Sequence, residues 1–313
     1  MSPAFVGLDG AALSGVNLAP DAWEPNLSPD GQWIVYVTRS TDVGSCGGCA
    51  DAPRLAVVRV DGTGSHFLDL HGVSIDDVSQ PVWSPDGTMI AFVQGDGAYY
   101  SGNIAVIDTG GTRSSGSSLG GVDRVHVIHL TSGPTQKSWP SWSPDGSSII
   151  YNDSGSTPLD DSGFSATQEI YSVAADGTGS PVRITHNQVD DSEAVYSPDG
   201  SKMALFHGGG VVIMNADGSN IRPTKSGGGF SPRWSPDGSK IAFFTYSDVE
   251  RYILPNPRTG RPYSWPRLDI KILTIATGGI ANVGVSVASD LNAVSWASDG
   301  QSLFVNRASN PSG

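Results

Sequence analysis

The sequence predicts an all-β fold, a six-bladed β-propeller made of four-stranded antiparallel blades. The phrase Ser-Pro-Asp-Gly occurs five times, each time after a large apolar residue and before a short apolar strand, and a decayed copy ends in Ala-Ser-Asp-Gly at 297–300. A second turn, mostly Asp-Gly, recurs between the copies, and no stretch shows a sustained helical period. A repeat of this kind is typical of an array of one supersecondary unit.

The shortest repeat, residues 196–229, shows the composition of one blade. A strand leads into Ser-Pro-Asp-Gly, a second strand ends at a Gly-rich link, and a third strand reaches the Asp217-Gly218 turn before a fourth. Asp and Gly accept the positive φ that tight hairpins need. Each repeat is therefore predicted to be an up-and-down sheet of four strands, A to D.

The chain ends predict how the ring closes. Residues 4–18 resemble the outer two strands of a blade, and residues 293–307 resemble the inner two. We expect a composite blade that leaves no open sheet edge, and hence a monomer. The chain is expected to be one domain, 1–313, with blades at about 19–72, 73–133, 134–187, 188–226, 227–287, and 288–313 plus 1–18.

The repeated units are similar to those of a known family. Trp-Ser-Pro-Asp-Gly-x-x-Ile-Ala-Phe and Val-x-x-Asp-Gly-Thr-Gly resemble the blades of TolB-type six-bladed propellers over nearly the whole chain. Such blades also serve in serine peptidases, polysaccharide lyases and surface proteins. The resemblance therefore implies the fold and leaves the function open.

Composition narrows the partners and the compartment. The net charge is −13 with only 18 Lys and Arg, which disfavours nucleic acid and anionic membranes because both require a basic surface. No apolar run reaches membrane-spanning length. Gly-rich, Pro-rich β repeats favour a periplasmic, secreted or cell-surface protein, and since no signal peptide precedes the first strand we expect a trimmed chain or one domain of a longer one.

The two cysteines, Cys46 and Cys49, lie in a loop of the first blade. A lone Cys-x-x-Cys lacks the second pair of a structural zinc site. A local disulfide is the favoured interpretation in an oxidising compartment, with unpaired thiols or a redox or metal role as alternatives.

Loop lengths point to one face of the ring. The A-B turns are all short, whereas the B-C connections are long at 39–54, 95–102, 152–167 and 246–266, so we expect the site on the B-C/D-A face. Six positions before each large residue, at the crossing from strand D to strand A, the aligned residues are Asp21, Asp77, Gln136, Asp190, Gly228 and Asp290, with Asp191 beside them.

Two interpretations of these aspartates stay open. Each one can cap its own turn, the commonest role of Asp in loops. Alternatively they form an acidic collar at the pore mouth that binds a basic peptide or a divalent cation, calcium or manganese. Strand-end histidines then complete a candidate metal set of Asp77, Asp190, His186 and His207, unless these histidines only bond to nearby backbone.

The long loop of the fifth blade adds an aromatic candidate surface. Tyr252, Tyr263, Trp265 and Arg251 are predicted to form a stacking wall for sugar rings or a peptide, or to pack on one another within the loop. The tryptophans before Ser-Pro-Asp-Gly are expected to be core between blades.

Two function classes follow. A non-catalytic binding propeller would hold a peptide, protein or glycan at the Asp-rich mouth and the long B-C loops. A carbohydrate-active enzyme, lyase or glycosidase, would use mouth carboxylates or His as acid and base. No Gly-x-Ser-x-Gly elbow is present, no catalytic residue is assigned, and the first class is favoured.

Overall fold

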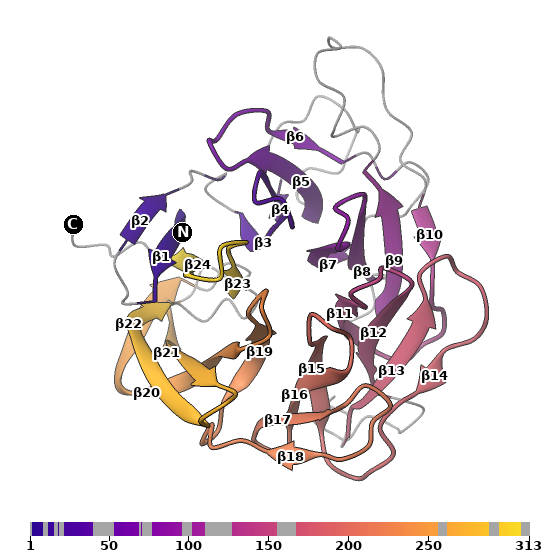
Figure 1. The fold of residues 1–313 in the computed structure, drawn as a ribbon. Coiled ribbons are helices and arrows are strands. Elements are labelled where there is room, and N and C mark those ends of the chain that lie inside the picture. Colours follow the sequence, from indigo (N-terminus) through magenta and orange to yellow (C-terminus); the bar gives the residue numbers. More distant parts are fainter. Residues whose placement is uncertain are drawn as a thin grey trace.

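The computed structural model describes residues 2–8, 12–15, 18, 22–39, 53–68, 70, 77–95, 102–109, 127–154, 167–255, 262–287 and 294–307. Within these ranges the side chains of 2–7, 12–15, 39, 77, 247–255, 262–267, 285–287 and 306–307 are not described. All regular structure in the described part is β-strand, arranged as antiparallel four-stranded sheets around a central axis (Figure 1). The described part holds no helix with the length and apolar character of a membrane span.

Five sheets are each built from one continuous stretch of chain, here called blades 1 to 5. Blade 1 is β3 (Trp23–Leu27), β4 (Trp33–Arg39), β5 (Pro53–Arg59) and β6 (His66–Phe67). Blade 2 is β7 (Asp77–Trp83), β8 (Met89–Gly95), β9 (Gly102–Asp108) and β10 (Val127–His129). Blade 3 is β11 (Lys137–Trp142), β12 (Ser148–Asp153), β13 (Glu169–Ala174) and β14 (Val182–Arg183).

Blades 4 and 5 follow the same order, with the first strand next to the axis. Blade 4 is β15 (Asp191–Tyr196), β16 (Lys202–His207), β17 (Gly210–Asn215) and β18 (Arg222–Pro223). Blade 5 is β19 (Phe230–Trp234), β20 (Lys240–Pro255), β21 (Pro262–Thr274) and β22 (Gly279–Val287).

The sixth sheet joins the two ends of the chain. Its order is β2 (Ala12–Gly15), β1 (Ser2–Gly7), β24 (Ser302–Arg307) and β23 (Val294–Trp296). The strands β1 and β24 pair from Ser2 opposite Arg307 to Gly7 opposite Ser302. The predicted β-propeller with a composite closing sheet is confirmed.

The Ser-Pro-Asp-Gly turns repeat one hydrogen-bond pattern. In blade 3, Ser143 Oγ donates to Asp145 Oδ1 at 2.6 Å and accepts from the Ser148 N–H at 3.0 Å, while Gly146 has φ of 72°. A glycine adopts this left-handed conformation without the penalty that a Cβ would bring. The phrase therefore recurs because each of its residues meets one requirement of the same tight turn.

Apolar side chains fill the spaces between neighbouring sheets. One cluster joins Val35 and Leu55 of blade 1 to Trp83 and Phe92 of blade 2. Trp83 and Trp142 are buried, and the Trp142 indole Nε1 donates to the Val82 carbonyl of the preceding blade at 3.1 Å. The prediction that these tryptophans are inter-blade core is confirmed for Trp83 and Trp142.

Candidate functional site

The innermost strand of each continuous blade contains a bulge at the same place. The residue three positions before the large apolar residue has a positive φ of 50–58° in all five, and the pairing register shifts there. These residues are Glu24, Gln80, Trp139, Glu193 and Ser231. A non-glycine residue in this conformation costs about 1–3 kcal/mol, so the surroundings must hold it in place.

Hydrogen bonds from blade to blade supply that restraint. Glu24 Oε2 accepts from the Gln80 N–H at 2.6 Å, and Gln80 Oε1 accepts from the Trp139 N–H at 2.6 Å. Glu193 Oε2 accepts from the Ser231 N–H and, at 2.9 Å, from the Ser231 hydroxyl. Glu24, Gln80 and Glu193 thus each bind the backbone of the bulge in the next blade, and we call this chain of contacts the inner clasp.

The inner clasp is interrupted at Trp139, because its indole side chain has no hydrogen-bond acceptor for the next blade. Asn152 of β12 takes over, because its Oδ1 accepts from the Glu193 N–H at 3.1 Å. Its side-chain nitrogen donates to Ser138 Oγ at 3.1 Å and to Gln168 Oε1 at 2.8 Å. Asn152 is fully buried, so every polar atom of its amide is used.

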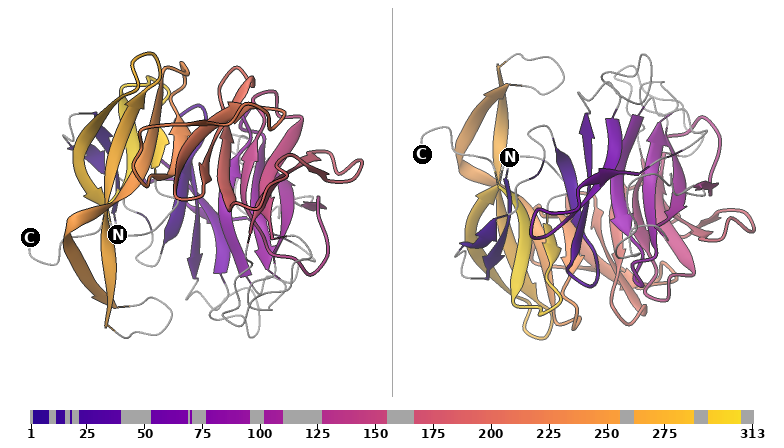
Figure 2. Two further views of the ribbon diagram at one scale, coloured as in Figure 1. Left: turned by 90° about the horizontal axis from the view of Figure 1, so that it is seen from below. Right: turned by 90° about the horizontal axis from the view of Figure 1, so that it is seen from above.

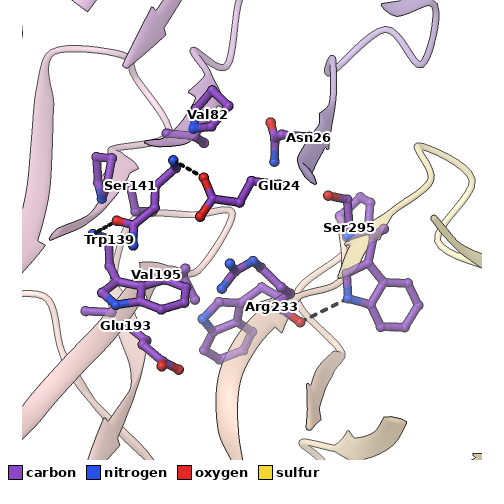
Figure 3. Close-up of a pocket in the computed structure, with 16 residues that line it drawn as sticks. Glu24, Asn26, Val82, Trp139, Ser141, Glu193, Val195, Arg233 and Ser295 are labelled. Atoms are coloured by element: carbon purple, nitrogen blue, oxygen red, sulfur yellow. Dashed lines mark hydrogen bonds between the residues drawn. The ribbon is translucent and has the colours of Figure 1, made fainter. Parts of the chain in front are cut away.

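The bulges line a cavity of about 280 Å³ on the propeller axis, which we call the channel pocket (Figure 3). All six sheets contribute to its wall. The lining residues include Glu24, Asn26, Gln80, Val82, Trp139, Ser141, Glu193, Val195, Arg233, Trp234, Ser295 and Trp296. Trp234 and Trp296, expected only as core, therefore also border the pocket.

Charged groups of opposite sign meet in this pocket. Burial raises the pKa of Glu193, while its bonds from Ser231 and the nearby charge of Arg233 act in the opposite direction. Burial likewise lowers the pKa of Arg233, and the charge of Glu193 opposes that shift. Arg233 still carries its charge because a guanidinium does not deprotonate in proteins.

Hydrogen-bonding capacity remains unused in the described wall of the pocket. Arg233 Nη1 donates to the Pro232 carbonyl at 2.8 Å, which leaves further guanidinium donors for another partner. The indole Nε1 of Trp234 is buried without a partner among the described residues. Figure 3 shows the Arg233 side chain pointing into the pocket. The pocket therefore presents donors, a carboxylate and indole rings to one small volume.

Two of the sequence-predicted site residues lie together at the start of β15, the inner strand of blade 4, before its bulge. Asp191 and His207 are directly opposed in β15 and β16, and Asp191 Oδ1 lies 2.5 Å from His207 Nδ1. Asp191 has no exposed side-chain surface, and its Oδ2 accepts from Asn187 at 2.6 Å. The His207 side chain is 24% exposed, so the buried carboxylate holds a histidine that solvent can reach.

The other predicted residues with described side chains have separate surroundings. Asp190 accepts from the Gln168 N–H at 3.1 Å. The residue is exposed, but partial burial of its carboxyl group raises its pKa, with a smaller contribution from Asp191. The Gln136 N–H donates to Ser154 Oγ at 3.2 Å. His186 is exposed and borders a shallow depression with Asp217 and Ser219.

No group of three or more His, Cys, Asp or Glu side chains able to hold a metal ion occurs in the described part of the chain. The predicted set of Asp77, Asp190, His186 and His207 includes one residue, Asp77, whose side chain lies outside it. The calcium or manganese site stays a prediction.

Several predicted residues fall outside the described part altogether. These are Asp21, Asp290, Cys46 and Cys49. Arg251, Tyr252, Tyr263 and Trp265 lie on described strands, but their side chains are not described. The acidic collar and the disulfide therefore remain predictions.

The sequence did hold a signal for the pocket residues. A proline directly follows the bulge residue in four blades, at Pro25, Pro81, Pro140 and Pro232. Aligning the repeats three positions before the large residue, instead of six, would have placed Glu24, Gln80 and Glu193 in one column.

Comparison with known proteins supports the fold. No protein-family model matches the chain. An uncharacterized protein of Agrobacterium fabrum is 33% identical over 136 residues, which covers 41% of this chain and 41% of that protein. The matched part is thus about two-fifths of that relative's length.

Solved structures resemble the whole ring. A protein of Agrobacterium tumefaciens provisionally assigned as TolB superposes with a TM-score of 0.66 and 19% identity, covering 97% of this chain and 96% of that one. TolB from Acinetobacter baumannii gives 0.59 and 18%, covering 90% and 62%. An oligogalacturonate lyase in complex with manganese gives 0.53 and 15%, covering 85% and 66%. The protein has the fold of the TolB-like β-propellers, as its repeats predicted.

Proposed function

We propose that this protein is an extracytoplasmic, non-catalytic binding propeller that holds a short segment of a partner protein in the channel pocket. The observation that carries the proposal is the pocket itself, a cavity of about 280 Å³ walled by all six sheets. A rigid concave site with a few converging polar groups in an apolar wall is the usual form of a ligand site.

The chemistry of the wall suits a peptide. Arg233 and the unpartnered Trp234 indole offer donors to carbonyl or carboxylate oxygens, and Glu193 offers an acceptor to amide or ammonium groups. Tryptophan rings add apolar contact area at little cost in conformational entropy. The inner clasp holds the bulge residues in place before binding, which reduces the entropy lost on association.

A periplasmic, secreted or cell-surface location belongs to the same proposal. Its support is the sparse charge of the chain, the net charge of −13 and the structural similarity to TolB proteins. The long B-C loops and the proposed acidic collar would extend the contact at the other mouth of the ring.

Peptide selection with a blocked-pocket variant tests the proposal. Peptides displayed on phage are selected on the wild-type protein and then measured against Val195→Trp, which fills the pocket without removing a clasp residue. Val182→Trp, on the exposed outer strand of blade 3, is the matched control. We expect at least a tenfold loss of affinity with Val195→Trp and none with Val182→Trp.

Equal affinities for the two variants, or the absence of any selected peptide, would contradict the proposal. Thermal melts of both variants establish that the ring is still folded.

A carbohydrate-active enzyme is the second candidate, and the Asp191–His207 pair is the observation in its favour. A buried carboxylate that holds one imidazole nitrogen leaves the other for proton transfer at the surface. Incubation with uronide oligosaccharides, with and without manganese, tests this candidate through the ultraviolet absorbance of an unsaturated product. Turnover that disappears in His207→Gln would support it, and no turnover under any condition would exclude this lyase activity.

A further inference from the structure

The channel pocket contains a cation that has no anion in contact with it. Arg233 donates from Nη1 to the Pro232 carbonyl at 2.8 Å, and it makes no other hydrogen bond and no ion pair with any described residue. The charge of Glu193 acts on Arg233 without such a contact. A guanidinium is always charged and carries five N–H donors, so most of the donors of Arg233 are left for another partner.

The surroundings of Arg233 make a bound anion favourable. The residue is partly buried, and burial lowers its pKa because the surroundings disfavour its charge. Charges that are removed from water are normally paired or fully hydrogen-bonded in proteins. Figure 3 shows the Arg233 side chain pointing into the pocket. An anion bound in the pocket would therefore supply the contact that Arg233 lacks.

Two amide side chains add donors from other blades. Gln80 Oε1 accepts from the Trp139 N–H at 2.6 Å, and Asn26 Oδ1 accepts from the Trp83 N–H at 3.2 Å. Each amide oxygen is thus held by a backbone N–H, and the NH₂ group is the end left for another partner. Neither NH₂ group has a hydrogen bond to a described residue, and both side chains line the pocket. Donors from blades 1, 2 and 5 therefore border the same small volume.

The charge around the pocket indicates which anion fits. The side views in Figure 2 show strands running from one face of the ring to the other, so the Ser-Pro-Asp-Gly turns share one face. The pocket reaches that face beside Pro236, an exposed residue of the turn in blade 5. Hydrogen bonds lower the pKa of the turn aspartates Asp145, Asp199 and Asp237 and keep them ionised. This acidic face repels a multiply charged anion such as phosphate, but it accepts a single carboxylate carried by a neutral or basic segment.

The size of the pocket indicates how the carboxylate is carried. Ligand pockets usually measure about 300–1,000 Å³, and this one, at about 280 Å³, lies just below that range. Paired extended segments lie about 4.7–4.9 Å apart, so a chain that enters the pocket and turns back needs room for two segments. A chain end needs room for only one. A terminal carboxylate therefore fits better than an acidic side chain within a longer segment.

We propose that the channel pocket binds the C-terminal carboxylate of the partner protein, with Arg233 as its counter-ion and the amides of Gln80 and Asn26 as further donors. This inference rests on the proposed function, because it names the part of the partner segment that enters the pocket. Arginine and carboxylate form two parallel N–H···O bonds, which also fix the direction of the bound chain. The residues before the terminus then leave the pocket toward the turn aspartates.

Matched peptide pairs test the inference. The display that tests the proposed function is run with peptides fused through their N-termini, so that every C-terminus is free. Each selected sequence is then synthesised with a C-terminal carboxylate and with a C-terminal amide, and dissociation constants are measured by titration calorimetry. We expect the carboxylate form to bind at least about tenfold more tightly.

Two variants change the charge of the wall and keep the acceptors of the inner clasp. Gln80→Glu keeps an oxygen for the Trp139 N–H, as Glu24 and Glu193 do at the equivalent positions, but replaces the NH₂ group by a second oxygen. It should weaken binding of the carboxylate peptide at least about tenfold and leave the amide peptide nearly unchanged. Glu193→Gln makes the opposite change and should strengthen binding of the carboxylate peptide.

Arg233→Gln tests the counter-ion directly. The difference in affinity between the carboxylate and amide peptides should disappear in this variant, since the two changes remove the same interaction. Arg222→Gln, on the exposed outer strand β18 of blade 4, is the matched control and should keep the difference. Thermal melts establish that each variant is folded. If Arg233→Gln does not fold, Gln80→Glu decides the question.

The outcomes separate this inference from the proposed function. Peptides that bind equally as carboxylate and amide, yet lose affinity with Val195→Trp, overturn the inference and leave the proposed function standing. A preference for the carboxylate that persists in both Arg233→Gln and Gln80→Glu also overturns the inference, because the carboxylate then binds elsewhere. If no peptide is selected, or if Val195→Trp has no effect, the proposed function fails and the inference fails with it.

Discussion

Glu193 allows the sharpest test of the inner clasp. Its carboxylate accepts from both the N–H and the hydroxyl of Ser231, and its own backbone has a φ of 57°. Replacing it with alanine removes the carboxylate that accepts from the N–H and the hydroxyl of the buried Ser231. Replacing it with glutamine keeps an amide oxygen that can accept both bonds.

The expected cost follows from the contacts. An unsatisfied buried donor costs about 1–3 kcal/mol, and hydrogen bonds to a charged group contribute about 1.5–3 kcal/mol each at most. We expect Glu193→Ala to lower the free energy of unfolding by about 2–4 kcal/mol and Glu193→Gln by less than about 1 kcal/mol at pH 7. The alanine variant should then melt several degrees lower.

The glutamine variant also has a predictable pH dependence. Burial raises the folded pKa of Glu193 above its unfolded value of 4.5, so the folded state retains the proton more strongly. Wild-type stability is therefore lost as the pH rises from 4.5 toward the folded value, and a residue that does not titrate avoids this loss. Glu193→Gln should gain on the wild type between pH 4 and pH 7.

Urea unfolding of the three proteins at pH 4, 5.5 and 7 measures both effects. The clasp argument is refuted if alanine and glutamine destabilise equally at pH 7. The account of the pKa would be refuted if the free energy of unfolding of Glu193→Gln fell relative to that of the wild type as the pH rises.

Three further predictions concern stability. Asn152→Ala should lower the free energy of unfolding in urea by about 2–4 kcal/mol, because it removes the acceptor of the Glu193 N–H and a buried amide. An unchanged free energy would refute the role of Asn152 as the acceptor that the Trp139 side chain does not supply. Hydrogen bonds lower the pKa of Asp145 and of Asp199 from 3.8 to about 2. The stability that these carboxylates contribute is present above the unfolded value of 3.8 and should be lost as the pH falls through about 2. Asp145→Asn should therefore reduce the loss of stability of the protein in acid. Deleting residues 1–18 should expose the edge of β24 and abolish a single cooperative melt, and a melt like that of the full chain would contradict ring closure by β1.

The fold was predictable because its rules are local and repeated. Ser143, Asp145 and Gly146 satisfy one another within a single turn, so the phrase can be interpreted without the rest of the chain. The closing sheet was predictable as well. Each end of the chain holds half of a blade, so each half can be completed only by the other.

The candidate site was less predictable because it depends on contacts between blades. Gln80 and Glu24 are 56 positions apart, and nothing within either repeat shows that one accepts from the other. The alternation of side-chain directions along the chain also determined which predicted residues are buried. Asp190 and Asp191 are neighbours in sequence, yet Asp191 is buried against His207 while Asp190 is exposed.

The sequence by itself therefore determined the blades, their turns and the closure of the ring, because short-range hydrogen bonds and hydrophobic patterning act within one repeat. Only the tertiary structure decided that the bulge residues meet at the axis, that Asn152 replaces the acceptor Trp139 lacks, and that Arg233 and Glu193 share one pocket. Those relations arise from the way adjacent sheets pack, and their energies depend on burial that no single repeat can produce.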